Sequence, residues 1–121
     1  QNSGTRCAVP VSGVLNAPGI AKAWVNFNGT GTVAIRGSFN VSSITDLGTG
    51  KYRVNFQTPL SNANYAIAAS HKKNDSLHGA IGPTGSADIT ANYCGLECIS
   101  DLGSGWVAAD SDVVTAVFFG N

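Results

Sequence analysis

The fold of this chain is most readily inferred from residues Lys22–Phe56, KAWVNFNGTGTVAIRGSFNVSSITDLGTGKYRVNF. Apolar and polar residues alternate within its short runs, as they do around Val25 and Phe27. A period of two places one face of a strand on a core and leaves the other face to solvent. The glycines of segments 28–31 and 47–50 permit the tight hairpins between runs. The sequence therefore predicts an all-β fold, an antiparallel β-sandwich or barrel-like domain with short strands and little or no helix.

Turn residues recur at the spacing typical of sandwiches and barrels, and they divide the chain into further strands. Strands are predicted at residues 22–28, 32–37, 39–46, 51–57, 64–71 and 112–119, and weaker patterns predict strands at 78–82, 86–93 and 105–109. Glycine and proline interrupt residues 1–20, which are predicted to be a connector. Residues 21–121 then form a single β domain.

The final run Val113–Phe119, VVTAVFF, is apolar at nearly every position. A strand with one solvated face would alternate, so this strand is predicted to be covered on both faces. Two arrangements provide such cover: a central place in the sheet, or contact of one face with a neighbouring subunit. We expect Val117, Phe118 and Phe119 at or near an oligomer interface.

The chain is unusually poor in charge. Seven basic and seven acidic side chains among 121 residues give no net charge, and charged residues amount to 12%. Ordinary soluble domains contain about 25%. Nucleic-acid binding is disfavoured, because nothing in this balance attracts a phosphate backbone. Low charge also protects little against association, so we expect a homo-oligomer, with a trimer as the favoured closed state. Membrane insertion is not expected, since no apolar stretch approaches the roughly 20 residues of a span.

Three cysteines leave several pairings open. Cys94 and Cys98 flank a glycine-containing segment, and their four-residue spacing does not match the usual two-residue zinc knuckle. A local disulfide between them, closing a surface loop, is favoured because Gly95 lets the loop curl. A bridge from Cys7 to either of them is the alternative. Any disulfide would form outside a reducing cytosol.

No arrangement of residues predicts catalysis. No serine lies in a nucleophile-elbow motif, and the titratable residues between His71 and His78 lack a framed nucleophile. Asp110 and Asp112 stand at a predicted turn, where aspartate is favoured for conformational reasons. We therefore expect no enzyme activity, no cofactor and no metal.

The sequence of the central stretch resembles that of a module of tailed-bacteriophage tail fibres and related virion-associated proteins. The matching pieces are AWVNFNGTGTVAIR at 23–36, SFNVSSITD at 38–46, ANYA at 63–66 and the closing strand at 113–120. The resemblance is closest over residues 21–70 and extends to the last ten, whereas 71–112 departs from it. That stretch typically varies in such modules, which suits a binding surface.

The resemblance implies a non-enzymatic phage virion protein, located on the extracellular particle, that presents variable loops for host attachment. Candidate receptor-binding residues in the variable half are His71, Lys72, Lys73, His78 and Trp106. Expected partners are copies of the same chain, other virion proteins, and a host cell-surface glycan or protein. The alternative is a purely structural capsid-decorating, connector or fibre-forming subunit. Because the chain begins with Gln1 and not with Met, we expect a processed product or part of a longer fibre chain.

Overall fold

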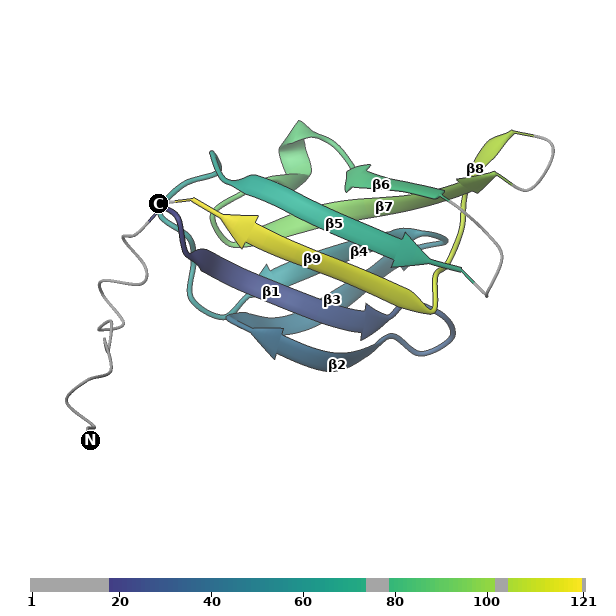
Figure 1. Cartoon of the computed structure of the whole chain (residues 1–121), viewed down its shortest axis with the longest axis horizontal. Helices are drawn as coiled ribbons and strands as arrows, with labels where there is room; N and C mark the ends of the chain where they lie inside the picture. Colours follow the sequence, from purple (N-terminus) through teal and green to yellow (C-terminus); the bar gives the residue numbers. More distant parts are fainter. Residues whose placement is uncertain (1–17, 74–78, 102–104, 121) are drawn as a thin grey trace.

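The computed structural model describes residues 18–73, 79–101 and 105–120, which form two stacked antiparallel sheets (Figure 1). The strands are β1 (Ala21–Asn28), β2 (Ala34–Phe39), β3 (Val41–Gly48), β4 (Lys51–Phe56), β5 (Ala66–Lys72), β6 (Gly79–Pro83), β7 (Tyr93–Asp101), β8 (Trp106–Ala108) and β9 (Val113–Phe119). Within the described ranges the helical content is one 3-10 turn, η1 (Ser86–Asp88). The predicted all-β sandwich-like fold is confirmed.

The first sheet has the strand order β2-β1-β9-β5, and the second has β3-β4-β7-β6 with β8 also paired to β7. Strands from the two ends of the domain, β1 and β9, are therefore neighbours in the middle of the first sheet. Figure 1 shows that β1 begins and β9 ends at the same end of the sandwich.

The core fills the space between the sheets, and its members on β1 and β4 are the residues that the alternation predicts. Its fully buried members come from β1, β4, β7 and β9: Ala23, Val25, Phe27, Tyr52, Val54, Cys94, Leu96, Cys98, Val114, Ala116 and Phe118. Aromatic rings meet edge to face across the layers, with Phe27 and Tyr52 centroids 5.1 Å apart. Phe56 and Phe118 have the same separation, 5.1 Å, and Tyr65 joins them.

The chain passes from the first sheet to the second at Asn40, which has a left-handed backbone with φ of 56°. Asparagine tolerates this conformation better than most residues because its short side chain bonds locally. Here the amide nitrogen donates to the carbonyls of Lys22 and Thr58, at 3.0 Å each, and the amide oxygen accepts from Thr58 N at 2.7 Å. The Asn40 side chain thus links the turn to β1 and to the segment that follows β4.

The opposite end of the sandwich is closed by the segment that precedes β9. The Tyr52 hydroxyl donates to the Gly29 carbonyl at 2.9 Å or to Asp110 Oδ1 at 3.1 Å, and it accepts from Ser111 N. Asp110 Oδ1 also accepts from Gly50 N at 2.8 Å. Asp110, which the sequence analysis assigns to a turn, therefore bonds the β3–β4 turn at Gly50 and the Tyr52 hydroxyl. Tyr52 in turn reaches the end of β1 at Gly29.

The prediction for the cysteines is wrong. The structure has a 3-10 turn at Ser86–Asp88 where a strand is predicted, and a long strand, β7, where a surface loop is predicted. Cys94 and Cys98 both point into the core with no exposed surface, and both are free. Four residues along a strand span about 13 Å, far beyond the roughly 7 Å that a disulfide allows between Cα atoms. The alternative partner, Cys7, lies outside the described residues.

The closing strand β9 has the predicted central position, but its two faces differ. Val114, Ala116 and Phe118 face the core and are fully buried. Val117 and Phe119 point to the outer side and are half-buried. The expectation that Phe118 contributes to an oligomer interface is therefore wrong, because its ring belongs to the core of its own domain. The expectation that Val117 and Phe119 lie at an oligomer interface stays a prediction.

Candidate interaction surface

A continuous row of apolar side chains crosses the outer side of the first sheet. The pairing register places Trp24 of β1 between Phe39 of β2 and Val117 of β9, and Val117 opposite Ala68 of β5. A second, shorter row places Phe119 opposite Ala66. Directly paired residues lie on the same side of a sheet with their Cβ atoms about 5 Å apart. We call this surface the apolar face; it consists of Trp24, Phe39, Ala66, Ala68, Val117 and Phe119.

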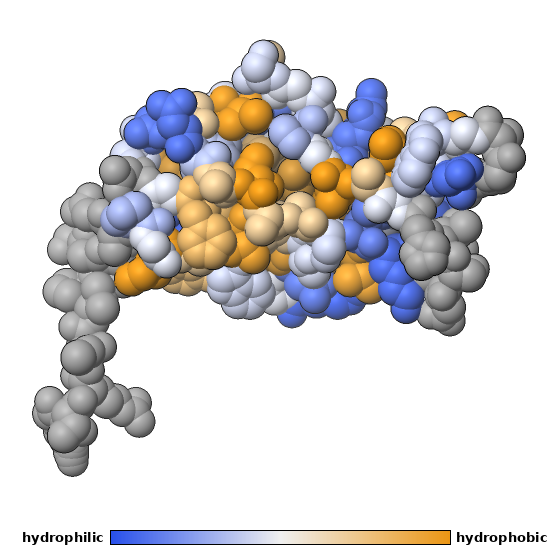
Figure 2. Space-filling model, turned by 45° about the horizontal axis from the view of Figure 1, so that its top comes forward, coloured by the Kyte–Doolittle hydropathy of each residue, from blue (hydrophilic) through white to orange (hydrophobic). Residues whose placement is uncertain are grey.

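The apolar face is open to solvent. Trp24 is 41% exposed and Phe39 is 44% exposed, which is high for large hydrophobic residues. Figure 2 shows hydrophobic side chains gathered over the sheet that carries β5 and β9. Soluble monomers seldom leave contiguous apolar patches uncovered, and such patches mark interaction sites.

The indole of Trp24 lies over a glycine of the neighbouring strand. A Cβ at Gly37 would lie 3.5 Å from two carbons of the Trp24 ring, which is an ordinary van der Waals contact. An alanine would therefore fit beneath the ring, whereas a bulky side chain would compete with the indole for this space. The small residue at this position keeps the surface around Trp24 flat.

Polar residues border the apolar face on one side. The Ser70 and Thr115 hydroxyls are 2.7 Å apart and link β5 to β9. On the neighbouring strands, Arg36 donates to Asn26 Oδ1 at 3.3 Å and to the Asp112 carbonyl at 2.6 Å. The outer side of the first sheet is therefore divided into an apolar half and a hydrogen-bonded polar half.

The candidate receptor residues do not form one cluster. Lys72 is exposed on the outer side of the first sheet, Lys73 is half-buried, and Trp106 is 58% exposed on β8 of the second sheet. His78 lies outside the described residues. His71 points inward, and its assignment as a surface contact is wrong.

His71 instead serves the interior. Its Nδ1 lies 2.7 Å from the hydroxyl of Ser111, which has no exposed surface, while its Nε2 is buried without a hydrogen-bond partner among the described residues. A nucleophilic serine must be reachable by substrate, and this one is not. The pair ties β5 to the segment before β9, which is a structural role.

The cysteines are likewise unsuited to chemistry. Burial raises the pKa of the Cys94 thiol to about 11 and that of Cys98 to about 12. The thiolate is the reactive form and the metal ligand, so both groups are inert at neutral pH. Across the described ranges, no three His, Cys, Asp or Glu side chains come close enough to hold a metal ion.

The apolar face was only partly foreseeable from sequence. The two-sided apolar pattern of 113–119 indicates it, and so does the position of Trp24 out of phase with Val25. Phe39 was missed because only the register of β1 with β2 brings it beside Trp24. The remaining signal was the alanine-rich run at 66–69, which is apolar on both sides of its strand.

Comparisons with known proteins identify no relative: no family model, curated protein or solved structure matches this chain. In the part of the chain that the structure describes, no helix has the length and apolar character needed to cross a membrane.

Proposed function

We propose that this chain is a non-enzymatic module of a phage virion protein, of the tail-fibre or tail-associated kind, which assembles as a homotrimer. The apolar face carries the proposal. In this arrangement it is buried between subunits, while the second sheet and the variable loops are presented to a host surface. The resemblance of residues 21–70 to tail-fibre modules supports the virion setting.

A second copy is the occupant that best fits the apolar face. The two apolar rows contain no charged side chain, and the chain has no net charge to oppose self-association. Stable homomeric interfaces resemble a domain core cut in half, with aromatic and aliphatic anchors at the centre. Trp24, Phe39 and Val117 provide such anchors. Closed cyclic symmetry limits the assembly to a defined size.

Sedimentation velocity at micromolar concentration tests the proposal. The wild-type chain should sediment as a trimer, and Phe39→Lys and Val117→Lys should sediment as folded monomers. Leu47→Lys is the matched control, because Leu47 is 39% exposed, close to the 44% of Phe39, but belongs to the second sheet. A wild-type chain that remains monomeric, or a control that dissociates equally, would contradict assembly through the apolar face.

Immunogold labelling of particles that carry the chain separates receptor recognition from the structural alternative. Label confined to the distal ends of tail fibres would support a recognition module. Label repeating along a shaft or over the capsid would favour a decorating, connector or fibre-forming subunit.

A further inference from the structure

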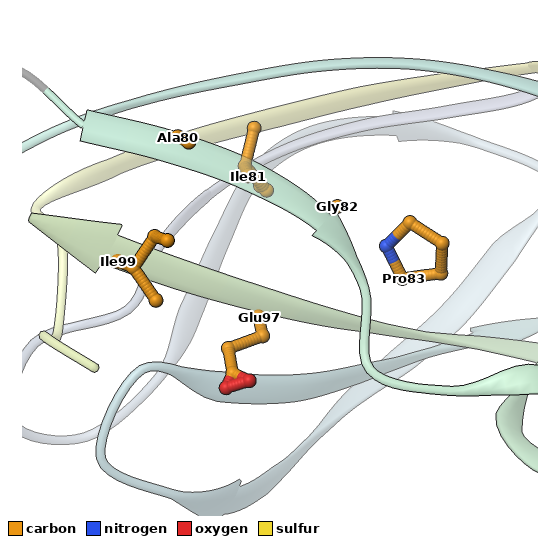
Figure 3. A pocket seen from close by; sticks show the side chains of 6 residues that line it. All are labelled: Ala80, Ile81, Gly82, Pro83, Glu97 and Ile99. Atoms are coloured by element: carbon orange, nitrogen blue, oxygen red, sulfur yellow. The ribbon is translucent and has the colours of Figure 1, made fainter. Parts of the chain in front are cut away.

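A groove runs along β6 and β7 on the outer side of the second sheet (Figure 3). It has a volume of about 300 Å³ and is lined by Ala80, Ile81, Gly82, Pro83, Glu97 and Ile99. It exists because the outward positions of β6 carry the smallest side chains: Ala80 pairs with Ile99 and Gly82 pairs with Glu97. A Cβ at Gly82 would meet no atom within 4 Å, so the space above β6 is empty and open to solvent.

The groove changes from apolar to polar along its length. Ile99 supplies an apolar surface, and Figure 3 shows it projecting from the same side of β7 as Glu97. Across the β4–β7 pair, Lys51 stands directly opposite Glu97. The polar end of the groove therefore offers the Glu97 carboxylate as a hydrogen-bond acceptor, and Lys51 lies beyond it, on the side of β7 away from β6.

An exposed indole stands near the apolar end. Trp106 pairs with Asp101, and Ala108 pairs with Ile99, so Trp106 is a diagonal neighbour of Ile99 on the same side of the sheet. At 58% exposure it is the most exposed of the large hydrophobic side chains that the structure describes. The indole, the isoleucine and the carboxylate form a line about 13 Å long, the span of residues 97 to 101 on a strand.

We infer that this groove binds a neutral sugar. A pyranose ring has an apolar face of C–H groups and a rim of hydroxyls. The indole and Ile99 match the apolar face, because aromatic rings attract the positive edges of such groups. Glu97 matches the hydroxyls, because its carboxylate accepts charge-assisted hydrogen bonds. The carboxylates of Glu97 and Asp101 on this side of β7 disfavour an anionic ligand.

The geometry favours binding without cleavage. Glycosidases hold two carboxyl groups about 5–9.5 Å apart across the scissile bond. Glu97 and Asp101 on β7 are separated by about 13 Å of strand. Asp88, whose side chain lies over Gly95, is bound to Arg53 and Thr84. The groove volume lies at the low end of the roughly 300–1,000 Å³ of small-molecule sites, which suits a short saccharide. The inference names a ligand for the proposed recognition of a host surface, and it therefore rests on the proposed function.

Titration of the ¹⁵N-labelled full chain with the methyl glycosides of glucose, galactose, mannose and N-acetylglucosamine tests the inference. At least one glycoside should shift amide resonances of residues 80–83, 97–101 and 106–108, with millimolar affinity, and should remain unhydrolysed. Trp106→Ala should weaken this affinity about threefold to tenfold, the equivalent of one aromatic contact. Absence of shifts with all four glycosides, or shifts located elsewhere, would overturn the inference.

A second variant removes the groove without touching a ligand-binding group. Gly82→Val should fold normally, since the site is open and valine suits a strand, and it should abolish the shifts by filling the groove. Gly85→Ala is the control, because it also lies in open space but does not line the groove. Retained sugar binding in Gly82→Val would refute the assignment. The oligomeric state is measured on the same samples, so a monomer that binds sugar would count against the trimer alone.

Discussion

Replacing Phe118 by alanine should destabilise the domain far more than the same replacement at the next residue. The Phe118 ring has no exposed surface, and its centroid lies 5.1 Å from Phe56 and 5.8 Å from Tyr65 in edge-to-face contacts. Buried Phe→Ala changes cost about 3–5 kcal/mol. Loss of two ring contacts places Phe118→Ala in the upper half of that range. A loss of this size is a large fraction of the roughly 5–15 kcal/mol that stabilises a typical domain.

Phe119→Ala is the matched control, because Phe119 is half-buried on the outer side of the same strand. Full burial of such a side chain contributes about 1.5–3 kcal/mol, so the control should lose less than about 1.5 kcal/mol when both variants are made in the monomeric Phe39→Lys background. Guanidinium unfolding followed by circular dichroism gives both values by linear extrapolation. For Phe118→Ala, the unfolding midpoint temperature should fall by roughly 10–20 °C. Equal losses in the two variants would refute the assignment of opposite faces.

Two further predictions concern titratable groups. Cys94 and Cys98 should resist alkylation at about pH 8 in the folded protein and react on unfolding, because burial raises their pKa to about 11 and about 12. Mass spectrometry of labelled peptides measures the extent of alkylation, and labelling of the native chain would contradict the prediction. The Thr84 hydroxyl, and then Arg53, lower the pKa of Asp88 from 3.8. A lowered carboxyl pKa stabilises the fold above the unfolded value and loses that effect as pH falls through the folded value. Stability should therefore drop below pH 3.8 in the wild type and less in Asp88→Asn, as acid unfolding curves would reveal; identical curves would exclude a role for Asp88.

Sequence reasoning located the strands with the most regular patterns. β1, β4 and β9 were predicted to within about two residues, β1 and β4 from their alternation and β9 from its continuous apolar run. The same reasoning missed β7, a central strand of the second sheet. Its inward residues are Cys94, Leu96, Cys98 and Ser100, and Gly95 interrupts the outward side. Gly95 reads as a loop signal in isolation.

In the structure, Gly95 leaves room for a segment that packs against β7. A side chain there would collide with Thr84 and Asp88, because the segment around η1 lies directly over this point of β7. Arg53 secures that segment through a 2.9 Å ion pair with Asp88 and stacks on the Tyr93 ring at 4.3 Å. A contact between segments distant in the sequence thus explains the glycine. No local pattern could have predicted it, and the groove along β6 depends on similar long-range pairing.

The distribution of charge, more than its scarcity, determines how this domain can associate. The apolar face has no charged member, whereas the outer side of the second sheet carries Lys51, Arg53 and Glu97. Association through the apolar face should therefore be insensitive to salt, because screening acts on exposed charges and not on apolar burial. The sedimentation coefficient of the proposed trimer should be unchanged between about 0.05 and 0.5 M sodium chloride, over which the Debye length shortens from roughly 14 to 4 Å. Dissociation at high salt would mean that ion pairs hold the subunits together, and it would indicate an interface on the second sheet, where the charged side chains lie.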